Sequence, residues 1–236
     1  MLASMTIPTT CNFIAARAAA ARKDWTFPAP NAGAAVDGGL VLTGSVLQFA
    51  KDSTIYAEGE PTRAFYKVMH GVVRTCRYLK DGHRQIDAFY LPGNVFGLEI
   101  GPERRLAAEA ASDCVLISCG RCKSERFGQA DEFFARQLFS YAMRCLQRAQ
   151  QHAQLLCHKS AVWKIAGFLL DMAERTPSRE GIDLPMARQD IADYLGMTIE
   201  TVSRTLSQLE RETVITIPTA RRIVMIDRAK LRRLGS

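Results

Sequence analysis

The chain has 236 residues, of which 47% are apolar and 23% charged. That length allows one or two domains with a full hydrophobic core, and the charged fraction is ordinary for a soluble protein. The net charge of +7 and the pI of about 9.2 favour a polyanionic partner. No apolar run approaches the roughly 20 residues of a membrane span, so we expect a cytoplasmic protein with no membrane partner.

The residue types that carry catalysis are not arranged for it. We find no convergent acid/base pair, nucleophile elbow or phosphate loop, and the four histidines have no ligand spacing. The seven cysteines show no paired secretory framework. We therefore expect a protein that is not an enzyme and that has no metal or other cofactor.

The N-terminal residues 1–39 are predicted to be a mobile leader. They are Ala-rich, with room for one short helix near residues 13–23. They lack the continuous apolar core of a secretory signal.

Residues 40–123 are rich in Gly, Val, Phe, Tyr and Ile, with turn signals at short intervals. That pattern is typical of an antiparallel sandwich or barrel. Asp81-Gly82 lies between two strand-like runs and predicts a β-hairpin.

Three cysteines near the end of this zone allow two interpretations. Cys114, Cys119 and Cys122 have C-x4-C-x2-C spacing, which is similar to a plant-type iron–sulfur loop. The alternative, which we favour, is a β-strand in which the first two serve as small apolar residues.

Residues 124–158 are predicted to contain a long dimerisation helix, because no Gly or Pro occurs from residue 131 to residue 158. Six residues recur at alternating spacings of four and three, as in a heptad seam: Leu138, Ala142, Cys145, Ala149, His152 and Leu156. We favour a seam between two copies of the chain. The alternative is a single helix lying on its own sheet, for which one apolar stripe is also enough.

Residues 189–210 indicate two short helices joined by a tight turn at Gly196. The second helix would bury one apolar face and present Glu200, Ser203 and Arg204 on the other. Arg can pair with guanine through two hydrogen bonds, and Glu can accept from the cytosine amino group. The alternative is a plain helical hairpin in which Glu200 and Arg204 form a solvated pair.

Two β-rich runs around a basic turn follow, which is the pattern of a winged helix over residues 159–236. Phosphate contacts position such a domain without specifying sequence. The candidates for these contacts are Lys164, Arg188, Thr201, Arg221 and Arg222.

A β-domain, a long helix and a C-terminal winged helix-turn-helix, in that order, resemble the cyclic-AMP-receptor/FNR family of transcription regulators. The stretch DLPMARQDIADYLGMTIETVSRTLSQLE is very similar to the family's DNA-binding signature. The resemblance implies an α+β fold with an N-terminal antiparallel β-roll. It also implies that the family's base-reading motif Glu-x-x-Ser-Arg falls on Glu200, Ser203 and Arg204.

The departures from the family pattern indicate the branch. Cyclic-AMP binders carry a Phe-Gly-Glu run and an Arg-Ser/Thr pair, whereas this chain has Phe96-Gly97-Leu98-Glu99 and Arg104-Arg105. FNR proper has clustered N-terminal cysteines, whereas the leader has only Cys11. The remaining resemblance is to the FixK-like branch.

The resemblance to that branch implies a homodimeric regulator, most simply an activator, that works with RNA polymerase and needs no bound effector. Its double-stranded DNA target would be a palindrome with TTGAT- or TTGAC-like half-sites. The alternative is a ligand-gated sensor of the same architecture that binds a cyclic nucleotide, haem or an iron–sulfur cluster.

Overall fold

The fold is taken from a computed structural model, which describes residues 44–120, 132–176 and 181–235. The predicted leader, its short helix and Cys122 lie outside these residues. None of the described helices is both long and apolar enough to cross a membrane.

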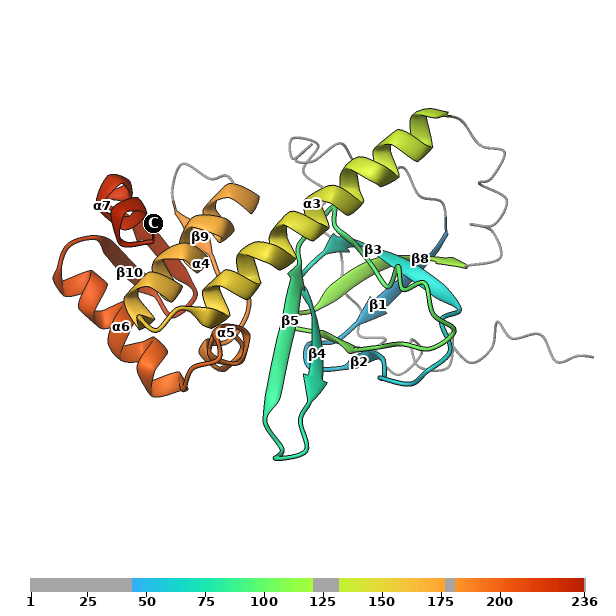
Figure 1. Ribbon diagram of the computed structural model, residues 1–236, viewed down its shortest axis with the longest axis horizontal. Coiled ribbons are helices and arrows are strands. Elements are labelled where there is room, and N and C mark those ends of the chain that lie inside the picture. Colours follow the sequence, from blue (N-terminus) through green and yellow to red (C-terminus); the bar gives the residue numbers. More distant parts are fainter. Residues whose placement is uncertain (1–43, 121–131, 177–180, 236) are drawn as a thin grey trace, which may run out of the picture.

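Two four-stranded antiparallel sheets face each other in the N-terminal domain and enclose a core (Figure 1). One sheet has the order β1-β8-β3-β6 and the other β2-β7-β4-β5. The strands are β1 (Ser45–Phe49), β2 (Thr54–Tyr56), β3 (Ala64–His70), β4 (Val73–Tyr78), β5 (Arg84–Tyr90), β6 (Val95–Phe96), β7 (Ala107–Ala110) and β8 (Cys114–Gly120). The predicted antiparallel β-roll is confirmed.

The Asp81-Gly82 hairpin is also confirmed. It joins β4 to β5, with Tyr78 opposite Arg84 at the closed end. Gly82 has a φ of +83°, a left-handed conformation that glycine adopts without strain. The interpretation of Cys114 and Cys119 as strand residues is correct too, because both lie in β8 and are buried.

The C-terminal half is helical apart from one small sheet. Its helices are α3 (Glu132–Cys157), α4 (Ala161–Arg175), α5 (Arg188–Leu195), α6 (Ile199–Arg211) and α7 (Arg228–Leu234). The wing is formed by β10 (Ile215–Thr219) and β11 (Arg222–Met225), and β9 (Ile182–Asp183) adds a third strand. The sequence does not predict β9 or α7. The latter packs on α4 through the fully buried Leu231.

The hydrophobic core continues from the β-roll into the DNA-binding half. Ile86 and Phe89 on β5 belong to the same buried cluster as Leu155 on α3 and Leu195 on α5. In Figure 1, α3 runs between the two halves, and the β4–β5 sheet edge lies beside α5. The two halves are therefore packed together and are not joined by a linker alone.

Candidate DNA interface

Helix α6 owes its position to one apolar face. Val202, Leu206 and Leu209 are almost fully buried, as is Leu195 at the end of α5. Thr198 is the N-cap, and its hydroxyl accepts a hydrogen bond from the backbone N–H of Thr201 at 3.2 Å. Such a cap stabilises a helix by about 1 kcal/mol.

The turn before α6 depends on Gly196. This residue has a φ of +60° and ends α5 in the left-handed conformation that closes many helices. The turn fixes the angle between α5 and α6, as the sequence predicts for a helix-turn-helix.

The opposite face of α6 carries the predicted base-reading residues. Glu200 and Arg204 are exposed, and Ser203 is half-buried between them. The pKa of Glu200 lies below its ordinary value, first because its own backbone N–H donates to the carboxylate, and then because of Thr198 and Arg204. The carboxylate is therefore charged and can accept a hydrogen bond at neutral pH. We call Glu200, Ser203 and Arg204 the recognition face.

Four of the five candidate phosphate contacts have exposed or half-buried side chains. Arg188, in the first turn of α5, donates from its guanidinium to the Ser203 hydroxyl at 3.3 Å, so it supports the recognition face directly. Thr201 lies on the first turn of α6, with its hydroxyl 3.1 Å from that of Thr198. Arg221 is exposed at the wing turn, and Arg222 begins β11 beside it.

The expectation for Lys164 is corrected. Its side chain is buried, and its ammonium donates to the backbone carbonyl of Leu195 at 2.9 Å. Leu195 is the last residue of α5, where carbonyl groups lack partners within the helix and attract cations. Lys164 therefore joins α4 to α5 and does not face solvent.

The structure corrects two of the six residues predicted for the α3 seam, because they pack against their own chain. Leu138, Ala142, Ala149 and Leu156 are exposed, but two of the other predicted residues face their own chain. Cys145 packs with Tyr141 against the β-roll. His152 stacks on Tyr194 of α5 with ring centroids 3.8 Å apart, and its Nε2 lies 2.7 Å from the Tyr194 carbonyl oxygen.

The exposed apolar stripe of α3 lies beside the predicted seam. Its members are all solvent-exposed in the single chain and recur at helical spacing: Phe139, Ala142, Met143, Leu146, Ala149, Ala153 and Leu156. Contiguous exposed apolar surfaces are typical of interaction sites. We call this set the α3 stripe.

The interior of the β-roll contains stacked aromatic rings and the buried Arg104 beside its aliphatic side chains. Tyr56, Tyr66 and Phe96 stack on one another at centroid distances of 5.3 to 6.1 Å. The Arg104 guanidinium lies 4.0 Å from the Tyr56 ring centroid. It pairs with the carboxylate of Glu99 at 2.6 Å and donates to the carbonyl oxygens of Gly97 and Ala64.

The described residues offer no evident metal site. Among them, no group of three or more His, Cys, Asp or Glu side chains is placed to hold an ion. Cys114 is instead buried, and burial raises the pKa of its thiol to about 11.

Comparisons with known proteins agree with this architecture. Residues 46–131 match the family model described as a cyclic nucleotide-binding domain, and residues 164–234 match the Crp-like helix-turn-helix domain. The chain is 43% identical to the nitrogen fixation regulation protein FixK of Azorhizobium caulinodans, over 84% of this chain and 82% of that protein. It is 41% identical to FixK of Rhizobium meliloti, over 76% and 82% of the two chains.

The fold is also that of a solved relative. The structure of FixK2 from Bradyrhizobium japonicum superimposes with a TM-score of 0.78 at 43% identity, over 83% of this chain and 98% of that one. A CRP-family regulator from Thermus thermophilus, at 29% identity and a TM-score of 0.65, has the same arrangement. The chain belongs to the CRP/FNR family of DNA-binding transcription regulators, is most like its FixK members among these relatives, and is not an enzyme.

Proposed function

We propose that this regulator acts as a homodimer that binds an FNR/FixK-like palindrome without a small-molecule effector and then contacts RNA polymerase. In the cytoplasm, two recognition faces would read the two half-sites, about 34 Å apart along the duplex. Arg204 would pair with a guanine, Glu200 with a cytosine amino group, and Ser203 with a base edge or a phosphate. Arg188, Thr201, Arg221 and Arg222 would contact the backbone.

The α3 stripe supports the dimer. Phe139 is 68% exposed and Leu146 49% exposed in the single chain, although both are large apolar residues of a long helix. Small residues at Ala142, Ala149 and Ala153 would let a second helix approach closely. A second copy of the same helix would bury the large and the small residues of the α3 stripe together, as in a coiled coil.

The interior of the β-roll supports independence from an effector. A cyclic phosphate needs converging donors that have no other partner. In the described β-roll interior, the Arg104 guanidinium lies against the aromatic rings. Its Nη1 and Nη2 already bond to Glu99 and two carbonyl oxygens, and only its Nε has no hydrogen-bond partner. The Glu99 carboxylate already provides Arg104 with the negative charge that the phosphate of a cyclic nucleotide would otherwise provide. This pairing is the observation that carries the proposal.

A ligand-free binding assay tests the proposal. The purified protein should shift a palindromic duplex without any addition, and cyclic nucleotides should leave its affinity unchanged. Calorimetry should detect no heat from those nucleotides. DNA binding that appears only after a cyclic nucleotide is added would support the ligand-gated alternative and reject this proposal.

A further inference from the structure

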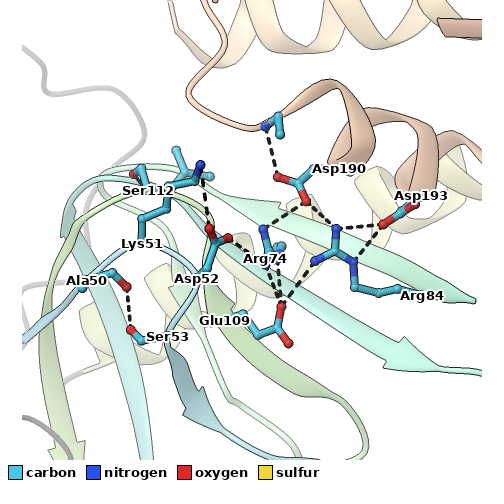
Figure 2. A network of polar contacts seen from close by, with 12 residues as sticks. Ala50, Lys51, Asp52, Ser53, Arg74, Arg84, Glu109, Ser112, Asp190 and Asp193 are labelled. Atoms are coloured by element: carbon cyan, nitrogen blue, oxygen red, sulfur yellow. Dashed lines mark hydrogen bonds and ion pairs between the residues drawn. The ribbon is translucent and has the colours of Figure 1, made fainter. Parts of the chain in front are cut away.

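Five charged side chains join the β-roll to the first helix of the helix-turn-helix (Figure 2). Arg74 lies on β4, Arg84 on β5 and Glu109 on β7, whereas Asp190 and Asp193 lie on α5. Asp52, at the turn before β2, adds a partly exposed sixth charge at 3.2 Å from Arg74. We call the first five residues the ionic clamp.

The bonds of the ionic clamp are short and directional. Arg84 donates from Nε to Asp193 at 2.8 Å and from Nη2 to Asp190 at 2.5 Å. Arg74 donates from Nη1 to the same Asp190 oxygen at 3.0 Å and from Nε to Glu109 at 2.9 Å. Both guanidinium groups therefore bridge the two halves of the chain, because each holds a carboxylate of α5.

The clamp is largely shielded from water. The side chains of Arg74 and Asp190 are 6% and 3% exposed, and those of Arg84 and Asp193 are 16% and 12% exposed. Burial alone would lower the pKa of Arg84, but Asp193 and Asp190 outweigh it and raise that pKa. Removing one partner would leave a buried charge without compensation, so the clamp tolerates little sliding between its two sides.

Asp190 links the clamp to the geometry of α5 itself. Its second carboxylate oxygen accepts a hydrogen bond from the backbone N–H of Ala187, the N-cap residue, at 3.1 Å. Ala187 has no side-chain oxygen to cap the helix in return. The same carboxylate therefore fixes both the start of α5 and its attachment to the β-roll.

The other contacts between α5 and the β-roll in the described chain are apolar or aromatic, whereas Lys164 of α4 and His152 of α3 bond to carbonyl oxygens at the C-terminal end of α5. Phe89 of β5 lies 5.2 Å from Tyr194, which stacks on His152 of α3. Apolar burial is not directional, so the apolar contacts hold α5 close to the β-roll without fixing its angle to that domain. The ion pairs supply that direction. The clamp contacts α5 and leaves the recognition face of α6 exposed.

We propose that the ionic clamp positions the recognition helix: it sets the orientation of α5 and α6 in the effector-free protein, so that the dimer accepts one half-site spacing. This inference rests on the proposed homodimer that needs no effector. Arg74, Arg84, Asp190 and Asp193 are positioning residues, and none of them needs to touch DNA. The clamp does by fixed contacts what a bound effector does in a ligand-gated regulator.

The test uses palindromes that differ only in the number of base pairs between half-sites. The variants are Arg84→Ala and the near-isosteric Asp193→Asn, and the control is Arg77→Ala. Arg77 neighbours the clamp on β4 but pairs with Glu58, within the β-roll, at 3.2 Å and with half-exposed side chains. Circular dichroism and sedimentation establish that each variant is folded and dimeric.

The parent and Arg77→Ala should bind one spacing and lose affinity when a base pair is inserted or deleted. Both clamp variants should bind the optimal spacing roughly 5- to 30-fold more weakly, because a smaller fraction of molecules holds the competent orientation. Their preference for that spacing should also fall. A loss of fold alone would lower binding to all spacings in proportion.

Two results would overturn the inference. Clamp variants that keep the parent's affinity and spacing preference would show that the ion pairs do not position α6, and tighter binding would show that they hold an inhibited state. Failure of the proposed function looks different, because the parent itself would then bind no palindrome without a ligand.

Discussion

Arg204 is the residue through which we propose that the recognition face distinguishes one sequence from another. It is exposed on α6, beside the charged carboxylate of Glu200. A guanidinium can form two parallel hydrogen bonds with guanine, and a lysine ammonium at the same site cannot. The chemistry at this position therefore depends on the shape of the group as well as on its charge.

The substitutions Arg204→Ala and Arg204→Lys separate these two contributions. Arg204→Ala should weaken binding to the palindrome by about 1–3 kcal/mol and relax discrimination among sequences. Arg204→Lys should lose most of the discrimination and keep the salt dependence, because the positive charge remains. Anisotropy titrations at several salt concentrations measure both. Full discrimination by the lysine variant would exclude a two-bond contact.

Arg221 and Lys164 are both basic but have different environments. Arg221 is exposed at the wing turn, whereas Lys164 is buried against the carbonyl of Leu195. Arg221→Ala should weaken binding uniformly across sequences and reduce the salt slope by about 1. Lys164→Met should leave the slope unchanged and lower the free energy of unfolding by about 1–3 kcal/mol, because a buried carbonyl loses its partner. Equal slopes for both variants would contradict this distinction.

Lys164 also marks a limit of sequence-based reasoning. A lysine in an amphipathic helix next to a DNA-binding motif is expected to face phosphate. Its real partner is the end of α5, 31 residues further along the chain, and only the tertiary packing brings the two together. Glu200, Ser203 and Arg204 were easier to place, because the apolar face of α6 determines the opposite face from the sequence alone.

At the scale of elements, α3 carries two apolar stripes side by side. Tyr141, Cys145, His152 and Leu155 face the β-roll, α4 and α5, whereas the α3 stripe faces solvent. The predicted seam includes residues of both stripes. Heptad spacing identifies apolar positions on a helix, but it does not show which of them pack against the β-roll of the same chain. The strand positions were more predictable, since turn residues such as Gly82 mark them locally.

A charge on the α3 stripe should separate the two copies. We expect Leu146→Glu to weaken the dimer at least tenfold, or by about 1.4 kcal/mol or more, because the carboxylate would be buried without a partner. Gln147→Glu is the control, since it adds the same charge at the next residue, off the stripe. Sedimentation over a range of concentrations measures both. A dimer that is insensitive to Leu146→Glu would place the interface elsewhere.

At the scale of the whole molecule, one buried cluster and the ionic clamp join the two halves. The sequence predicts each half but not their contact. Arg74 and Arg84 look like ordinary polar residues in a strand pattern, and their partners on α5 lie more than 100 residues away. His152 lies at the same junction, between Tyr194 and the acidic residues Asp87 and Asp171.

His152 should make the stability of this junction depend on pH. Burial lowers its pKa below the ordinary value, although the Tyr194 carbonyl and the two acidic residues act against this shift. The unfolded chain therefore binds a proton that the folded chain excludes. The contribution of His152 to the free energy of unfolding is complete above the pKa of the unfolded state, about 6.5, and is lost as the pH falls below that value.

His152→Phe would keep a ring against Tyr194 but could not be protonated. The loss of thermal stability between about pH 7.5 and about pH 5.5 should be smaller in this variant than in the parent. Differential scanning calorimetry at both pH values measures the difference. An identical loss in both proteins would mean that other groups carry the acid sensitivity.

The most direct measurement is a double-mutant cycle that combines one substitution in the protein with one base substitution in the DNA. The ligand-free parent and Arg204→Ala are each titrated with a TTGAT-type palindrome and with the same duplex in which the half-site guanines are replaced by adenines. We expect the parent to lose affinity on the altered duplex, the variant to lose less because only the Glu200–cytosine contact remains to be lost, and a coupling of about 1–3 kcal/mol per half-site. Equal binding of the parent to both duplexes, or unchanged discrimination by Arg204→Ala, would contradict the account.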